Sequence, residues 1–332
     1  MSPRMKIRIA ALLLCAGLGA LAVQAQDEAA ASPNAGTLPR AAEMAALSSK
    51  ALLLGIARAG DQMVAVGDRG NILLSADGDT WEQVPVPVNV TLTAVSFADA
   101  KSGWAVGHDA AILHTADGGR SWTLQHFDPG LGQPALSVLA LDAQRALIVG
   151  AYGMGFGTND GGKTWAELAA PAIREEGLHL NALIKLGDGQ LFVTGETGMI
   201  GVSTDGQIWE RLTLPYEGSL FGALPRGEKG AIVFGLRGNV LVTDDVRGNA
   251  WTPVDIGSVQ SLYGGAVLAQ GGVVLVGADG EIVYISADGK VRRAPALEGP
   301  EGNGAGSLSG ALPWRDGLQL VGESGIGRAS IP

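Results

Sequence analysis

The chain has almost no cysteine, few aromatic residues and few charged residues. Its single cysteine, Cys15, lies near the N-terminus, so the rest of the sequence can form no disulfide framework. Charged residues make up 17% and hydrophobic residues 46%, which excludes a disordered chain, and 15 prolines are too few for collagen. The 23 basic residues are outnumbered by 33 acidic ones, so we expect no broad basic surface that could bind nucleic acid.

Only one long apolar run occurs, from Ile9 to Val23, and it follows three basic residues, Arg4, Lys6 and Arg8. A charged start, a short apolar stretch and small residues up to Ala25 are typical of a secretory signal peptide. The run is shorter than the roughly 20 residues that a membrane-spanning helix needs. We therefore expect cleavage after Ala25 and a periplasmic protein, with a retained membrane anchor as the alternative.

The predicted organisation is a signal peptide (1–25), a flexible polar linker (26–37) and one folded domain (38–332). Leu14 stands before Cys15 where a lipoprotein cleavage site has a small residue, so we expect no lipid anchor. Loss of the signal removes three basic residues and takes the net charge from −10 to −13. No other stretch is apolar for 18 residues, so the cleaved protein is not expected to span a membrane.

Glycine, in contrast, is abundant, and it marks a repeat. A hydrophobic run that ends in glycine recurs at spacings of 40 to 45 residues, which is typical of four-stranded propeller blades. Short apolar runs alternate with glycine turns in each unit, so the prediction is an all-β, seven-bladed β-propeller of four-stranded antiparallel blades. The marker glycines are Gly67, Gly107, Gly150, Gly195, Gly235, Gly277 and Gly322.

The third turn of most units has the form of an Asp-box, S/T-x-D-x-G-x-S/T-W. The aspartate is expected to accept backbone N–H groups, glycine to supply a positive φ, and tryptophan to pack between neighbouring sheets. These residues are predicted to be structural. They are Asp77, Trp81, Asp117, Trp122, Asp160, Trp165, Asp205, Trp209, Asp245, Trp251 and Asp288.

The seventh unit ends too early to contain its own fourth strand. The box hydroxyl lies eight residues after the marker glycine in five of the first six units, and Gly322 plus eight is Ser330, close to Pro332. We expect a strand from the N-terminal segment, within Leu38 to Ser49, to complete the last blade and close the ring. The alternative is an open solenoid.

The Asp-boxes, together with Leu52–Gly60 and Val66–Ser75, resemble the photosystem II stability/assembly factor family, especially its exported proteobacterial branch. This resemblance covers about residues 38–332. It implies a seven-bladed propeller that binds proteins and helps to assemble a membrane complex, which in proteobacteria would be envelope transport machinery.

Enzymatic readings find little support in the residues. Sialidases share the Asp-box, but they need an arginine cluster and a Tyr–Glu pair, and only Tyr216 precedes a glutamate, Glu217. The segment Gly157–Thr164 matches a phosphate-binding loop, yet Pro171 leaves no room for the helix that such a loop requires. The four histidines are not clustered like metal ligands. We expect no metal, cofactor or nucleotide.

Polar turns between the second and third strands, together with the connections between blades, are the predicted binding face, because recognition usually lies on loops of a rigid scaffold. The predicted function is a non-catalytic periplasmic scaffold or assembly factor for an envelope or membrane protein complex. The alternative is a glycoside hydrolase or carbohydrate-binding propeller. The candidate contacts are Asp68, Arg69, His108, Asp109, Tyr152, Glu196, Arg237, Asp279 and Glu323.

Overall fold

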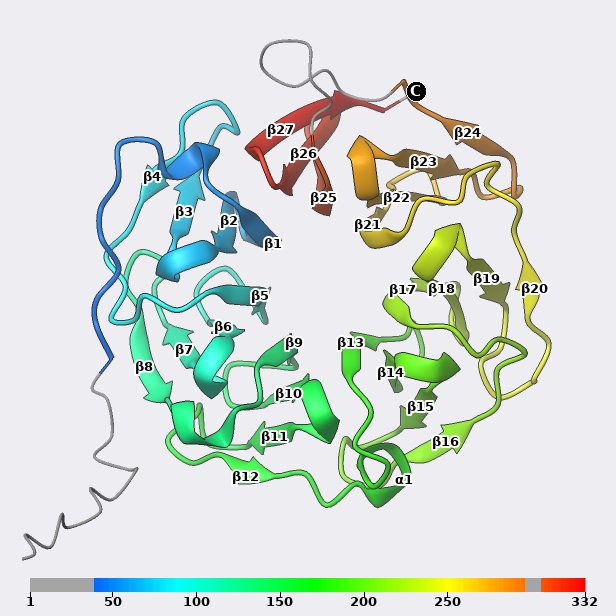
Figure 1. Cartoon of the computed structure of the whole chain (residues 1–332), viewed down its shortest axis with the longest axis horizontal. Coiled ribbons are helices and arrows are strands. Elements are labelled where there is room, and N and C mark those ends of the chain that lie inside the picture. Colours follow the sequence, from blue (N-terminus) through cyan, green and yellow to red (C-terminus); the bar gives the residue numbers. More distant parts are fainter. Residues whose placement is uncertain (1–38, 296–305, 332) are drawn as a thin grey trace, which may run out of the picture. The chain divides into compact units, whose positions relative to one another are not determined.

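The computed structural model describes residues 39–295 and 306–331, and this part of the chain is a seven-bladed β-propeller (Figure 1). In each blade the chain runs from the innermost strand outward. Every marker glycine ends a second strand as predicted, from Gly67 to Gly322. The predicted signal peptide and linker lie outside the described residues.

Six blades have four antiparallel strands each, and the seventh has three. Blade 1 consists of β1 (Leu53–Ala59), β2 (Gln62–Gly67), β3 (Ile72–Ser75) and β4 (Glu82–Gln83). Blade 2 consists of β5 (Leu92–Phe97), β6 (Gly103–Gly107), β7 (Ile112–Thr115) and β8 (Thr123–His126). Blade 3 consists of β9 (Ala135–Ala140), β10 (Ala146–Gly150), β11 (Gly155–Thr158) and β12 (Ala166–Glu167). Blade 4 consists of β13 (Leu180–Lys185), β14 (Leu191–Gly195), β15 (Ile200–Ser203) and β16 (Glu210–Leu212), and blade 5 of β17 (Leu220–Arg226), β18 (Gly230–Gly235), β19 (Val240–Thr243) and β20 (Thr252–Pro253). Blade 6 consists of β21 (Leu262–Val267), β22 (Val273–Gly277), β23 (Ile282–Ile285) and β24 (Val291–Arg293). Blade 7 consists of β25 (Leu308–Trp314), β26 (Gly317–Gly322) and β27 (Gly325–Ser330).

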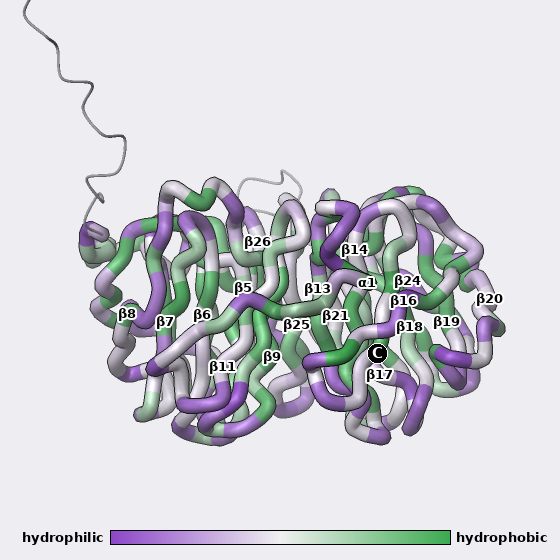
Figure 2. Tube along the Cα trace, turned by 90° about the horizontal axis from the view of Figure 1, so that it is seen from below, coloured by the Kyte–Doolittle hydropathy of each residue, from purple (hydrophilic) through white to green (hydrophobic). Residues whose placement is uncertain are grey.

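Helical structure in the described residues is limited to single turns. They are α1 (Pro171–Arg174) and the 3₁₀ turns η1 (Ser48–Lys50), η2 (Asp68–Gly70), η3 (His108–Ala110), η4 (Pro129–Leu131), η5 (Ala151–Gly153), η6 (Glu196–Gly198), η7 (Leu236–Gly238) and η8 (Ala278–Gly280). Figure 2 shows hydrophobic residues concentrated along the strands and hydrophilic residues at the turns on both faces of the ring.

The core lies between adjacent blades. Trp122 of blade 2 is 6% exposed and packs against Val64 and Leu74 of blade 1. Trp209 and Trp251 are also buried and contact the preceding blades, whereas Trp81 and Trp165 are half-buried. Because each Asp-box tryptophan reaches the preceding sheet, the repeat joins consecutive blades as well as shaping a turn.

The seventh blade departs from the prediction. Its sheet contains β25, β26 and β27, and no residue from Pro39 to Ser49 adds a strand to it. That segment instead follows the outer side of blade 1, where the backbone N–H of Ala42 donates to the Val86 carbonyl at 2.8 Å. Closure by an N-terminal strand is therefore wrong for the described residues. The segment is rich in alanine, which has a low strand propensity, and it ends in η1 beside β27.

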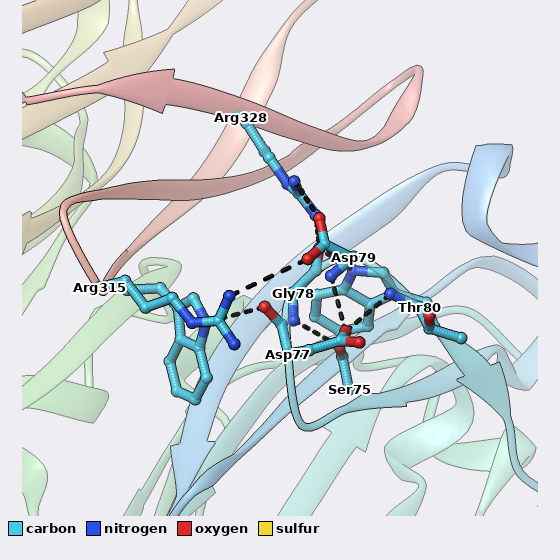
Figure 3. Close-up of polar contacts among 9 residues, drawn as sticks. Ser75, Asp77, Gly78, Asp79, Thr80, Arg315 and Arg328 are labelled. Atoms are coloured by element: carbon cyan, nitrogen blue, oxygen red, sulfur yellow. Dashed lines mark hydrogen bonds and ion pairs between the residues drawn. The ribbon is translucent and has the colours of Figure 1, made fainter.

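Side chains hold blades 7 and 1 together in place of that strand. Arg328 of β27 donates to the Gly78 carbonyl and forms an ion pair with Asp79, both in the Asp-box turn of blade 1 (Figure 3). Trp314 Nε1 donates to the Asp77 carbonyl in the same turn at 3.2 Å.

The innermost strands of blades 7 and 1 are joined as well. Ser309 Oγ donates to the Leu53 carbonyl at 2.6 Å. Thr93 makes the same kind of bond to Ala135, which joins blades 2 and 3.

Candidate functional site: the turn face

The seven turns between second and third strands share one face with the connections between blades. In each blade, the first residue of this turn donates its N–H to the carbonyl of the residue that precedes the innermost strand, as Asp68 does to Leu52 at 3.0 Å. The corresponding donors are His108, Ala151, Glu196, Leu236, Ala278 and Glu323. We call this surface, made of the seven turns and the inter-blade connections, the turn face.

All of the predicted binding residues lie on the turn face. Asp68 and Arg69 are in η2, His108 and Asp109 in η3, Tyr152 in η5, Glu196 in η6, Arg237 in η7, Asp279 in η8, and Glu323 in the turn between β26 and β27. The connection that leads from blade 6 to blade 7 is described only in part, because residues 296–305 lie outside the described residues.

The middle residues of six of these turns have a left-handed backbone, although none is glycine. Their φ angles lie between 52° and 57° at Arg69, Asp109, Tyr152, Thr197, Arg237 and Asp279. This conformation costs about 1–2 kcal/mol for a residue with a Cβ. Hydrogen bonds of the turn maintain it, as where Asn71 N–H donates to the Asp68 carbonyl at 3.0 Å. Six side chains are thereby presented from nearly identical backbone frames.

Thr197 was missed as a candidate. It occupies the same register after its marker glycine as Arg69 and Tyr152, followed by glycine at the next position. Its position in the repeat would therefore have identified Thr197, but only charged and aromatic residues were considered as contacts.

The face brings residues from blades 3 and 4 into contact. The ring of Tyr152 meets the ring of His179 edge-on, with centroids 4.7 Å apart, and the tyrosine is 59% exposed. Glu196 accepts the backbone N–H of His179 at 2.9 Å and lies 3.6 Å from its Nδ1. His179 was not among the predicted binding residues; its position just before β13 places it on this face.

Other predicted residues make local contacts. Gln260 Nε2 donates to Asp279 at 2.9 Å, and Glu323 accepts the N–H of Ser307 at 3.1 Å. The Tyr216 hydroxyl donates to the Leu236 carbonyl at 3.3 Å. Burial raises the pKa of Tyr216 from its ordinary value, and nearby Arg237 offsets part of that rise.

An ion pair between a buried glutamate and a half-exposed arginine lies in blade 6 on this face. Glu281, whose side chain is 4% exposed, accepts two hydrogen bonds from Arg293, at 2.8 and 2.9 Å, and one from Ser258 at 2.7 Å. Burial works to raise the pKa of Glu281, but Arg293 and Ser258 outweigh it and the pKa is lowered. The carboxylate is thus held ionised with its oxygens occupied, which suits a structural brace for the Ser258 connection.

A cleft of about 570 Å³ opens beside blade 1, between the N-terminal segment and η2. Asp68 and Arg69 line it together with Glu43, Leu47 and Asn71. The Arg69 side chain lies 3.5 Å from Asp68 but is 88% exposed, and Leu47 is 73% exposed, so a partner can reach both. The cleft combines a cationic and an apolar contact, as peptide-binding surfaces often do.

The predicted residues do not converge on one reaction centre. Arg69 belongs to blade 1 and Arg237 to blade 5, on separate sectors of the ring. In the described residues, no group of three histidine, cysteine, aspartate or glutamate side chains is arranged to hold a metal ion. Residues 39–295 and 306–331 also contain no helix long and apolar enough to cross a bilayer.

The Asp-box aspartates lie in the turns between third and fourth strands, at the opposite face. Asp160 accepts the backbone N–H of Thr164 at 3.0 Å and its hydroxyl at 2.7 Å, and these bonds lower its pKa to about 2. Asp117 makes the same two bonds with Ser121. The carboxylates are occupied within their own turns, which fits the structural role expected of them.

Comparisons with known proteins agree with this architecture. The model of the family described as photosynthesis system II assembly factor YCF48 matches residues 73–293. The photosystem II assembly lipoprotein Ycf48 of Synechococcus sp. (strain CC9902) is 29% identical over 148 residues, which cover 38% of this chain and 44% of that protein. The chain thus matches less than half the length of this curated relative.

Two solved structures share the fold. One described as YCF48 bound to D1 peptide has a TM-score of 0.67 at 20% identity, over 89% of this chain and 97% of that chain. Virginiamycin B lyase from Staphylococcus aureus has a TM-score of 0.72 at 11% identity, over 88% and 99%. At these identities both likenesses show the fold alone, but the family match extends over most of the propeller. The chain belongs to the photosynthesis system II assembly factor YCF48 family.

Proposed function

We propose that this chain is a non-catalytic periplasmic scaffold that binds protein through its turn face and assists the assembly of an envelope or membrane protein complex. Its family is described as an assembly factor, and a solved relative is described as bound to a peptide. The observation that carries the proposal is the set of six left-handed turn residues. Their backbone is fixed before a partner arrives, so this chain loses little backbone ordering entropy on binding.

A glycosidase role is less well supported. Tyr216, the tyrosine next to a glutamate, uses its hydroxyl as a donor to Leu236, and burial raises its pKa. Both effects oppose its ionisation to a nucleophile.

Site-specific photo-crosslinking tests the proposal. A photoreactive residue at Arg69 or Tyr152 should give discrete protein adducts in cells, whereas the same residue at Lys101 or Lys163, exposed on the opposite face, should not. Adducts that form equally from both faces, or glycan turnover by the purified protein, would contradict the proposed function.

A further inference from the structure

Strand β27 is a sheet edge, and its pairing pattern shows which groups it leaves open. Gly322 and Gly325 flank a two-residue turn and pair with each other. Since hydrogen-bonded and non-bonded pairs alternate in an antiparallel ladder, Ile326, Arg328 and Ser330 direct their N–H and C=O groups away from β26. The Ser330 carbonyl is occupied by the Tyr284 hydroxyl at 2.8 Å.

In the other blades, the third strand is hydrogen-bonded to an outer strand at the equivalent edge. The carbonyl at the start of the third strand accepts an N–H from the chain at the outer strand: Ile72 from Val84 at 3.0 Å and Val240 from Val254 at 2.9 Å. Gly155 and Ile282 accept the same bond in their blades. The register makes Ile326 their equivalent, because Val321 pairs with Ile326 as Val66 pairs with Ile72. Among the described residues, nothing beyond β26 bonds to the Ile326 backbone.

A cleft of about 360 Å³ adjoins the open edge on the blade 6 side, lined by Leu268, Tyr284 and Ile331. Trp122 packs against Val64 and Leu74 of the preceding blade, and the register gives Val274 and Tyr284 as the blade 6 equivalents. The cleft therefore has the position and the apolar lining for a large side chain that begins an outer strand.

The surface beside this cleft is basic, although the whole chain is acidic. Arg292 and Lys290 line it; Lys290 is 85% exposed and forms an ion pair with Asp288 at 2.7 Å, so the two cations together exceed the one neighbouring carboxylate. On the blade 1 side, a second cleft of about 280 Å³ includes Lys50, Arg328 and the ion-pair partner of Arg328, Asp79. Acidic groups on an incoming segment would be attracted to this rim.

We propose that the outer edge of β27 is a second docking site, which takes an extended acidic segment of a partner protein as the fourth strand of blade 7. The segment pairs its backbone with Ile326 and Arg328 and places an aromatic side chain in the cleft beside Tyr284. This is strand addition to an exposed sheet edge, with main-chain bonds supplying affinity and the cleft supplying selectivity. The outer strands of the six four-stranded blades show which kind of segment suits this edge.

A peptide copied from the chain, Ser203–Leu214 (STDGQIWERLTL), is the probe. It carries Trp209, strand β16 and one net negative side-chain charge. Titration of the purified protein should show saturable binding, with slowed amide exchange at Ile326 and Arg328. Methylation of the Leu212 nitrogen, the residue that pairs with Ile200 in blade 4, should weaken binding at least tenfold, as should Trp209→Ala in the peptide.

Variants of the protein supply the matched control. Arg292→Glu should weaken binding of the probe several-fold, whereas Lys163→Glu, on blade 3, should leave it unchanged. The proposal is overturned if the peptide does not saturate, or if N-methylation has no effect. It is also overturned if exchange at Ile326 and Arg328 is already slow in the free monomer, which would mean that the chain's own residues hold the edge, or if these amides become protected only on self-association.

Discussion

Replacing Arg328 with alanine should weaken the junction of blades 7 and 1 more than replacing its acidic partner. The Arg328 side chain is 50% exposed and that of Asp79 is 58% exposed, so their ion pair contributes at most about 1 kcal/mol. The bond from Arg328 to the Gly78 carbonyl has a charged donor, a class that contributes about 1.5–3 kcal/mol. We expect a loss of about 2–4 kcal/mol for Arg328→Ala and about 1 kcal/mol or less for Asp79→Ala.

Denaturant unfolding and hydrogen exchange of β27 and β3 measure this difference. Salt separates the two contributions, because about 1 M salt shortens the Debye length to roughly 3 Å and screens the exposed ion pair. The Asp79→Ala effect should then disappear while most of the Arg328→Ala effect remains. Arg315→Ala serves as the control, since Arg315 lies 4.0 Å from Asp79 and is 62% exposed. Equal losses for Arg328→Ala and Asp79→Ala, both abolished by salt, would refute the reasoning.

Three further predictions concern the blades and turns. Trp122→Ala should cost about 3–5 kcal/mol of unfolding free energy, because Trp122 is buried, and Trp165→Ala should cost less, because Trp165 is half-buried; calorimetry of the two variants decides. The pKa of Asp160 is lowered from 3.8 to about 2, so its contribution is complete above pH 4 and is lost as the pH falls from about 4 to 2. Asp160→Asn should therefore reduce the slope of stability against pH in that window, and an unchanged slope would contradict the assignment. Thr197→Gly should stabilise the protein by up to about 1 kcal/mol by relieving a left-handed β-branched residue, whereas Gly198→Ala, at φ +70° and crowded by the Tyr216 carbonyl, should destabilise it; thermal melts of both variants test the sign.

The fold was predictable because one pattern recurs in seven units of the sequence. The glycine that ends the second strand recurs in all seven units, and an Asp-box or a remnant of one follows the third strand in six of them, at a nearly constant offset; each has a local physical cause. The fourth strand of blade 7 was not predictable in this way. Its prediction assumed that the last blade follows the others, but the N-terminal segment lies on blade 1, and Arg328 stands where Leu74 stands in blade 1.

The turn face was predictable as a place but not as a set of contacts. Register alone puts Tyr152 and Glu196 in equivalent turns, whereas their link through His179 depends on how two blades and a connection pack. The left-handed backbone was not anticipated either. Glycine normally indicates positive φ, and here the residue before the turn glycine adopts it too, as Tyr152 does before Gly153.

Occupation of the β27 edge should offset a loss of stability at the junction of blades 7 and 1, because a ligand that binds only the folded state shifts the folding equilibrium toward it. A ligand that binds only the folded edge, at a concentration 100 times its dissociation constant, stabilises the folded state by about 2.7 kcal/mol. That gain is similar to the loss expected for Arg328→Ala. The main chain at position 328 can still pair with a peptide in this variant. The Ser203–Leu214 peptide at saturation should therefore return the unfolding midpoint of Arg328→Ala close to that of the unliganded wild type. The N-methylated peptide should not do so at the same concentration. Equal recovery with both peptides would show that the effect does not pass through strand pairing at β27.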